Sequence, residues 1–212
     1  MQLRGAGGAI CKAIQRPEPL QRGNEVAACV EFEPETDSQH PRDRAGEGKA
    51  KTSTSPTPVA CSVCVVTPLS EAEADTLKFM REEEKLARDV YSALSPYYPG
   101  NVFKNIAASE QKHFDAIGEK LVLYGIPDPA SDQVGVFNNP ALQAMYDELY
   151  AEGMSGYAEA LGVGVTIEEE DIVDLEVAIA GTTSKPLILT YKHLLSSSES
   201  HLAAFTRLLD RL

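Results

Sequence analysis

From Thr67 onward, apolar residues recur at the three- and four-residue spacing of an α-helix, and this period constrains the fold more than any other feature of the chain. In the first such segment the buried series is expected to run through Leu77, Met80, Ala87 and Tyr91. A β-type alternation of useful length does not occur, so the sequence gives no support for a sheet. Four segments have lengths of about 23–27 residues, which is typical of the long helices of a bundle. The sequence therefore predicts an all-α fold.

Capping residues and helix breakers divide this region into separate helices. Ser70-Glu-Ala-Glu73 has the Ser-x-x-Glu spacing of a capping box, which marks the start of the first helix. The long helices are expected from Ser70 to just before Pro96, from Asn101 to Gly125, over roughly residues 155–180, and from Ser184 to the C-terminus.

The connection between the second and third long helices spans about 30 residues, which is enough to travel the length of a bundle. Within it, Asn139-Pro140 has the pattern of an N-cap followed by proline at the first helical position. This pattern predicts a short helix that continues to about Glu152. We therefore expect a four-helix bundle with one long crossover that contains a short helix.

Residues 1–65 have a different character. They carry eight basic and eight acidic residues, six of the 13 prolines and all four cysteines, without a sustained helical or strand period. Such a segment cannot bury enough apolar surface to offset its ordering entropy, so we expect a disordered extension over residues 1–65 and one bundle domain over residues 66–212. Cys61-Ser-Val-Cys64 is interpreted as two thiols in this extension, because a zinc ribbon needs a second ligand pair.

The charge distribution excludes several classes of function. Residues 66–212 hold 11 Lys and Arg against 24 Asp and Glu, which accounts for the whole net charge of −13. A nucleic-acid backbone binder needs clustered basic residues, so no nucleic-acid partner is expected. No run approaches the roughly 20 apolar residues of a membrane-spanning helix. The first residues lack the pattern of a signal peptide, which favours a cytoplasmic location.

Polar residues interrupt all four apolar stripes near the helix midpoints. They are Glu84 in the first helix, Glu110 and His113 in the second, Glu168 in the third, and Ser198 and His201 in the fourth. An ionised carboxylate that faces a core costs several kcal/mol unless it is paired or metal-bound. Carboxylates and imidazoles that converge in a bundle core are suited to iron or manganese.

Two neighbouring features have simpler interpretations. Glu82 and Glu83 are expected to be solvated, because the run Arg81-Glu-Glu-Glu-Lys85 offers ion-pair partners along the helix. The third long helix has an alternative late start, at which Thr166 and Glu169 would form a capping box. We prefer the longer helix, because it places Glu168 at the height of the other polar residues.

Glu84-Lys-Leu-Ala-Arg-Asp-Val-Tyr91, Glu110-Gln-Lys-His113 and the later Glu and His resemble the ferritin-like diiron-carboxylate superfamily over about residues 68–212. The nearest branch is rubrerythrin-type or a related ferritin-like family. This resemblance implies a ferritin-like four-helix bundle with one Glu on the first and third helices and Glu-x-x-His on the second and fourth. It also implies that Glu84, Glu110, His113, Glu168 and His201 are metal ligands.

The fourth helix departs from that pattern, because Ser198 stands where the second Glu is expected. Glu199 lies about 100° away around the helix and is a poor substitute. Asp171, one turn from Glu168, can supply the missing carboxylate. The alternatives are an asymmetric dinuclear site, a single-metal site, or a bundle that binds no metal.

The resemblance implies a metal-binding protein that acts as an oxidase or peroxidase on O₂ or hydrogen peroxide. The implied cofactor is two iron ions, with manganese or a single metal as alternatives. Rubrerythrins usually carry two Cys-x-x-Cys pairs, whereas this chain has only Cys61-Ser-Val-Cys64, so the electron donor is unidentified. A homodimer is one candidate assembly. The alternative function is a non-catalytic helical bundle that buffers metal or binds another protein through its acidic surface.

Overall fold

The computed structural model describes residues 66–212, which form five α-helices and contain no strand. The helices are α1 (Glu71–Leu94), α2 (Val102–Tyr124), α3 (Pro140–Gly153), α4 (Tyr157–Ala180) and α5 (Lys185–Leu209). The all-α prediction, the four long helices and the short helix in the crossover are thereby confirmed. The predictions for residues 1–65, including Cys61 and Cys64, lie outside the described residues.

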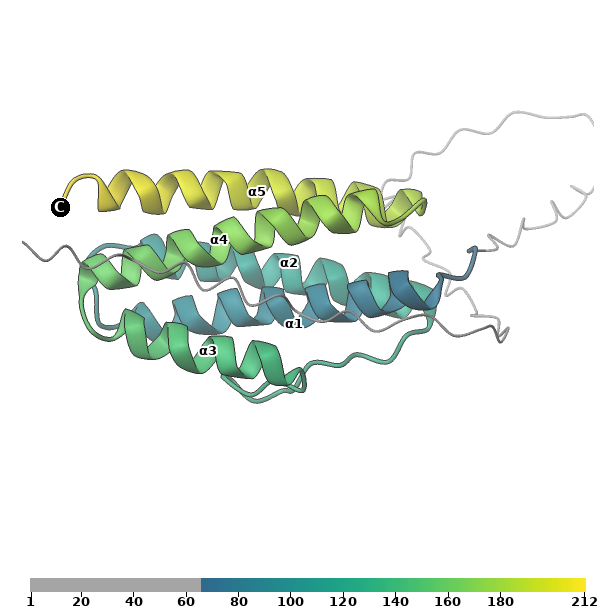
Figure 1. Ribbon diagram of the computed structural model, residues 1–212, viewed down its shortest axis with the longest axis horizontal. Coiled ribbons are helices and arrows are strands. Elements are labelled where there is room, and N and C mark those ends of the chain that lie inside the picture. The colour runs from purple at the N-terminus through teal and green to yellow at the C-terminus, as the bar shows by residue number, and fades with distance from the viewer. Residues whose placement is uncertain (1–65) are drawn as a thin grey trace, which may run out of the picture.

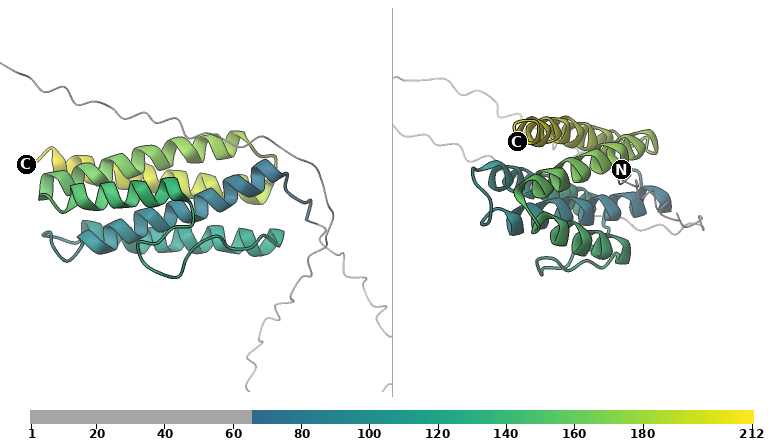
Figure 2. Two further views of the ribbon diagram at one scale, coloured as in Figure 1. Left: turned by 60° about the horizontal axis from the view of Figure 1, so that its bottom comes forward. Right: turned by 60° about the vertical axis from the view of Figure 1, so that its left-hand side comes forward.

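The long helices form two antiparallel hairpins, α1 with α2 and α4 with α5, as Figure 1 shows. Helix α3 packs against α1 and α4, and the views in Figure 2 place it on the flank of the bundle. Contacts between α1 and α4 and between α2 and α5 join the hairpins. The crossover is the segment between α2 and α3. It starts at the end of α2 and runs back along α1 before α3 begins (Figure 1).

The helix ends follow the capping signals with one exception. Ser70 and Glu73 form the capping box of α1, and Gly125 ends α2 in the left-handed conformation at φ 65°. Asn101 occupies the N-cap position of α2, but its side chain makes no capping hydrogen bond.

Helix α4 is continuous from Tyr157 and does not start at Thr166. It therefore contains Gly164, whose role is packing. A Cβ atom there would lie 2.6 Å from the ring of Phe205 on α5, closer than van der Waals contact permits. The glycine that weakens helix propensity is thus required for the close approach of α4 and α5.

The apolar core consists of two clusters with a polar layer between them. One cluster contains Val90, Phe103, Leu161 and Phe205, and the other contains residues nearer the opposite end of each long helix. The second cluster contains Leu77, Met80, Ile117, Leu121, Leu175, Leu187, Tyr191 and Leu194. On every long helix, the polar residues that interrupt the stripe fall between these clusters. The fold therefore brings them to one height.

The expectation that Glu82 and Glu83 are solvated is wrong. Glu82 is 4% exposed and Glu83 is 6% exposed, and Lys85 is fully buried. The crossover covers Glu82 and Lys85, which contact Asn138 and Gln133. Glu83 instead faces α4, where its neighbours are Asp171 and Asp174. No helix among residues 66–212 is both long and apolar enough to cross a membrane.

Candidate metal centre

Five of the residues singled out in the sequence meet in the polar layer, and each of the four long helices contributes at least one of them. They are Glu84 from α1, Glu110 and His113 from α2, Glu168 from α4 and His201 from α5. All are buried, with exposed fractions between 1% and 9%. Their spacing in the sequence predicts that these residues face the core, because each occupies a core position of its helix.

The side chains form two groups that share Glu110. In the first group, His113 Nδ1 lies 2.8 Å from Glu110 Oε2 and 3.2 Å from Glu84 Oε2. In the second group, His201 Nδ1 lies 2.7 Å from Glu110 Oε1 and 3.5 Å from Glu168 Oε2. In each group the candidate ligand atoms lie within 4.8 Å of one another. Each group has the donors and the size to hold one metal ion.

Several buried atoms in this layer have no hydrogen-bond partner among the described residues. They include Glu84 Oε1, Glu110 Oε1 and His201 Nδ1. The last two approach to 2.7 Å but are not aligned as a hydrogen bond. Buried polar atoms without partners are costly. A bound cation is one way to satisfy such atoms, since the candidate ligand atoms of each group lie close together.

Asp171 lies beside the five residues but belongs to neither group. It is 5% exposed, and its Oδ1 has no hydrogen-bond partner among residues 66–212. Ser198, which replaces the expected carboxylate of the fourth helix, is fully buried and donates to the Leu194 carbonyl at 3.1 Å. The hydroxyl of Ser198 also faces Asp171. The layer therefore receives two acidic residues from α4 and none from α5, while Glu199 is exposed.

Glu83 is a buried carboxylate that sequence reasoning missed. Its Oε2 has no hydrogen-bond partner within the part of the chain that the structure describes, and its neighbours include the acidic residues Asp171, Asp174 and Glu84. A signal was available, because Glu83 lies three residues after Met80 and four before Ala87, both of which are buried.

The electrostatics of the layer favour a bound cation or bound protons. Burial, followed by the nearby Asp171 and Glu110 carboxylates, raises the pKa of Glu84 well above its ordinary value. Burial likewise raises the pKa of Glu168 and of Asp171 to about 7. A cation that replaces the proton stabilises the ionised form of such a buried carboxylate.

His113 and His201 lower the pKa of Glu110, whereas the pKa values of Glu84, Glu168 and Asp171 are raised. Burial alone would raise the pKa of Glu110, but the close approach and charge of His113 and His201 outweigh it and lower the pKa to about 2. For His201, burial opposes protonation, because the protonated imidazole is the charged form. Glu110 and Glu168 outweigh this effect and raise the pKa of His201 to about 9. Without metal, protons on the imidazoles compensate part of the carboxylate charge.

Tyr91 supports the second group from the neighbouring apolar cluster. Its hydroxyl is buried and donates to Glu168 Oε1 at 2.8 Å. Burial, and then the Glu168 carboxylate, raises the pKa of Tyr91 well above its ordinary value, so the phenol remains a donor. Tyr91 therefore fixes one oxygen of Glu168 and leaves the other facing His201.

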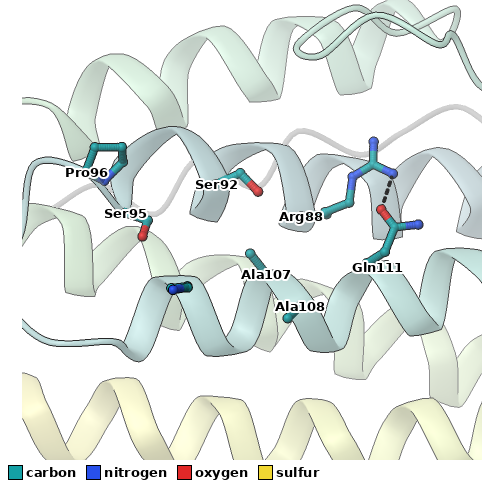
Figure 3. A pocket seen from close by; sticks show the side chains of 8 residues that line it. Arg88, Ser92, Ser95, Pro96, Ala107, Ala108 and Gln111 are labelled. Atoms are coloured by element: carbon teal, nitrogen blue, oxygen red, sulfur yellow. Dashed lines mark hydrogen bonds between the residues drawn. The ribbon is translucent and has the colours of Figure 1, made fainter.

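A separate groove with a volume of about 450 Å³ lies between α1 and α2 (Figure 3). Its lining includes Arg88, Lys104 and Gln111 but none of the five residues of the polar layer. The Arg88 guanidinium is already engaged, because it donates to Asp89 at 2.8 Å and to Gln111 at 3.0 Å. The groove is therefore distinct from the candidate metal centre.

The fold and this layer define an α-helical bundle protein with a buried cluster of Glu and His that can hold metal. Residues 73–211 match the family described as an uncharacterized protein domain, DUF2202, and the chain belongs to that family. Over 144 residues it is 46% identical to the uncharacterized protein MJ0754 of Methanocaldococcus jannaschii, a match that covers 68% of this chain and 78% of that protein.

Two solved structures are similar to the bundle. The crystal structure of hypothetical protein MJ0754 from Methanococcus jannaschii superposes with a TM-score of 0.67 at 45% identity, over 69% of this chain and 84% of that one. The crystal structure of a DUF305 fragment from Deinococcus radiodurans gives a TM-score of 0.55 at 11% identity, over 69% of this chain and 100% of that one. The second similarity concerns the fold alone.

Proposed function

We propose that this chain binds two divalent metal ions in its polar layer, iron first and manganese as the alternative, and that it reduces O₂ or hydrogen peroxide there. The observation that carries the proposal is the pair of three-residue groups, Glu84 with Glu110 and His113, and Glu110 with Glu168 and His201. Glu110 directs one oxygen to each histidine, so a single carboxylate can contact both ions. The resemblance of the spacing to ferritin-like diiron-carboxylate proteins agrees with this arrangement.

The donor set and the charge of the layer fit two such ions. Carboxylate oxygen and imidazole nitrogen are suitable ligands for iron and manganese. Glu84, Glu110 and Glu168, together with Asp171, carry a charge of −4 when all four are ionised, and two divalent ions carry +4. Glu83, whose pKa is raised well above its ordinary value by burial and then by Asp171, lies beside these four carboxylates. The same ions would provide partners for Glu84 Oε1 and Glu110 Oε1, which accept no hydrogen bond from any residue of the described bundle. Asp171 thus supplies in α4 the charge that Ser198 does not supply in α5.

Each residue of the layer has a distinct role in this proposal. Glu84 and Glu168 would each help to hold one ion, and Glu110 belongs to both groups of candidate ligands. His113 and His201 would act as neutral nitrogen donors, and Tyr91 holds Glu168 in place. Bound iron or manganese would supply the electrons that reduce O₂ or peroxide, and an external donor would restore them. The apolar clusters on both sides of the layer exclude bulk water from it.

Anaerobic loading with Fe²⁺ tests the proposal directly. The full chain should bind about two iron ions, and subsequent O₂ or hydrogen peroxide should produce the near-ultraviolet absorption of ferric iron. Glu110→Ala combined with His113→Ala should abolish binding, because these changes remove the shared ligand and one imidazole. Glu199→Ala is the matched control. It removes a carboxylate that is exposed and one residue from the buried face, so binding should persist.

The same experiment separates the alternative functions. Two ions bound without any reaction with O₂ or peroxide would indicate a metal-buffering bundle. One ion bound would indicate that the Ser198 side of the centre is incomplete. A chain that takes up no iron, manganese or zinc would contradict the metal proposal and leave a protein-interaction role.

A further inference from the structure

His201 presents its two ring nitrogens to different surroundings. Nδ1 faces the carboxylates, at 2.7 Å from Glu110 Oε1 and 3.5 Å from Glu168 Oε2. Nε2 lies 3.3 Å from the hydroxyl oxygen of Ser197. His201 is also the most exposed of the five residues, at 9%. The hydrogen-bond partner of Nε2 therefore determines which ring nitrogen faces the candidate metal centre.

The hydroxyl of Ser197 is itself linked to a second helix. Ser197 lies one turn before His201 on α5, and its Oγ is 3.4 Å from Ser109 Oγ on α2. Both serines are half-buried. The series His201, Ser197, Ser109 therefore joins the polar layer to the partly solvated seam between α5 and α2.

Three consecutive serines on α5 have three different surroundings. Ser196 is exposed, Ser197 contacts His201, and Ser198 is fully buried and donates to the Leu194 carbonyl. Only the middle hydroxyl is in contact with an imidazole nitrogen. This difference distinguishes Ser197 from a serine that merely favours helix packing, and it provides a control at the adjacent position.

The chemistry of imidazole gives this contact a consequence. Neutral histidine has one N–H and one nitrogen lone pair, and the hydrogen bond made by one nitrogen determines which nitrogen binds metal. If Nε2–H donates to Ser197 Oγ, the lone pair of Nδ1 is directed at Glu110 and Glu168. The Ser197 hydroxyl remains able to donate to Ser109.

The geometry points to Ser197, supported by Ser109, as the positioning residue that directs His201 Nδ1 toward the second group of metal ligands. This inference rests on the proposed function, since it concerns the same centre. Ser197 does not touch the metal in this scheme. It acts through the orientation and tautomer of His201, as hydrogen-bond partners of metal-binding histidines commonly do.

Titration of the full metal-free chain with Co²⁺, followed by visible absorption, tests this role. Ser197→Ala should weaken one of the two equivalents by about 10- to 100-fold and leave the other unchanged, because the His113 group does not contact Ser197. Ser197→Thr keeps the hydroxyl and should restore the affinity. Ser109→Ala, which removes only the outer hydroxyl, should give a smaller loss, and Ser196→Ala should give none.

A second readout does not depend on affinity. In the Zn²⁺-loaded protein, long-range proton–nitrogen NMR spectra should show His201 bound through Nδ1 with hydrogen on Nε2. In Ser197→Ala that pattern should be lost or mixed, while the melting temperature of the metal-free variant stays that of the parent.

If Ser197→Ala leaves both equivalents and the tautomer unchanged, or weakens both equivalents alike, the role of Ser197 is refuted while the metal centre stands. A parent chain that binds no Co²⁺ or Zn²⁺ refutes the proposed function and this inference together.

Discussion

Helix α1 carries two sets of buried charges that differ in how they are satisfied. One set faces the crossover and comprises Arg81, Glu82, Lys85 and Asp89; we call these the crossover-facing charges. The other comprises Glu83 and Glu84, which face the polar layer; we call these the centre-facing charges. The two sets alternate within a stretch of nine residues, so local sequence composition does not separate them.

The crossover-facing charges are paired in detail. Lys85 Nζ donates to Asp89 at 2.6 Å and to the Gln133 carbonyl at 2.8 Å. Arg81 donates to Asp128 at 2.7 Å. Glu82 accepts from the backbone amide of Asn138 at 2.6 Å. These contacts hold the crossover against α1. They also satisfy the crossover-facing charges without a bound ion.

The centre-facing charges have the opposite character. Glu83 Oε2 and Glu84 Oε1 have no hydrogen-bond partner among residues 66–212, and other carboxylates lie near both residues. The second oxygen of Glu84 lies 3.2 Å from His113 Nδ1. The comparison teaches that burial alone does not identify a candidate ligand. A buried charge with complete partners indicates a structural role, whereas a buried carboxylate among other carboxylates is a candidate for cation binding.

Lys85→Met should produce the largest loss of stability. It removes one member of a buried ion pair, and such losses typically cost about 3–5 kcal/mol. We expect about 3 kcal/mol, because Arg88 still donates to Asp89. The measurement is the free energy of unfolding in urea without metal. Lys78→Met is the control: its partner Asp75 is exposed, so the change should cost no more than about 1 kcal/mol.

Metal should stabilise the protein through the centre-facing side only. At a free Mn²⁺ or Zn²⁺ concentration about 100 times the dissociation constant, the free energy of unfolding should rise by about 2.7 kcal/mol. Glu84→Ala should reduce this gain, because Glu84 belongs to the first group of ligands. Glu199→Ala should retain it. An equal gain in the parent and in Glu84→Ala would show that metal binds elsewhere.

The stability of the metal-free protein should fall as pH rises from about 4.5 to about 9. The folded-state pKa values of Glu168 and Asp171, about 7, exceed those of unfolded carboxyls, so the folded state holds more protons across the lower part of this range. The raised pKa of His201, about 9, extends the effect upward. Urea unfolding at pH 5 and pH 8 measures it. Glu168→Gln should flatten the profile, and a parent protein that is more stable at pH 8 would contradict the assignment.

The smallest expected effects are changes in the free energy of unfolding for two adjacent glutamates, Glu82 and Glu83, and the two changes should differ in sign. Glu82→Gln should lower the free energy of unfolding by about 1 kcal/mol, because it replaces an acceptor of backbone N–H bonds. Glu83→Gln should leave the metal-free stability unchanged or raise it at pH 8, since it removes a buried negative charge from among other carboxylates. If both variants lose stability equally, the distinction between the two sets of charges fails.

Much of the candidate site could be predicted from the sequence because it follows a simple helical period. Glu84, Glu110, Glu168 and His201 each interrupt an apolar stripe near a helix midpoint, and in a bundle such positions meet at one height. Helix lengths, the long crossover and most caps followed from equally local signals. Those features depend on spacing within one helix, which the chain displays directly.

Other features were decided by the tertiary structure. The burial of Glu82 and Lys85 depends on a crossover that begins more than 30 residues later in the chain and covers α1. The burial of Glu83 depends on α4, which brings Asp171 and Asp174 beside it. The position of Asp171 beside Ser198 likewise depends on how α4 packs against α5. Sequence periodicity determines which face of a helix is apolar. Only packing determines what covers the other faces, and that decides whether a charge meets water, a partner of opposite charge or other carboxylates.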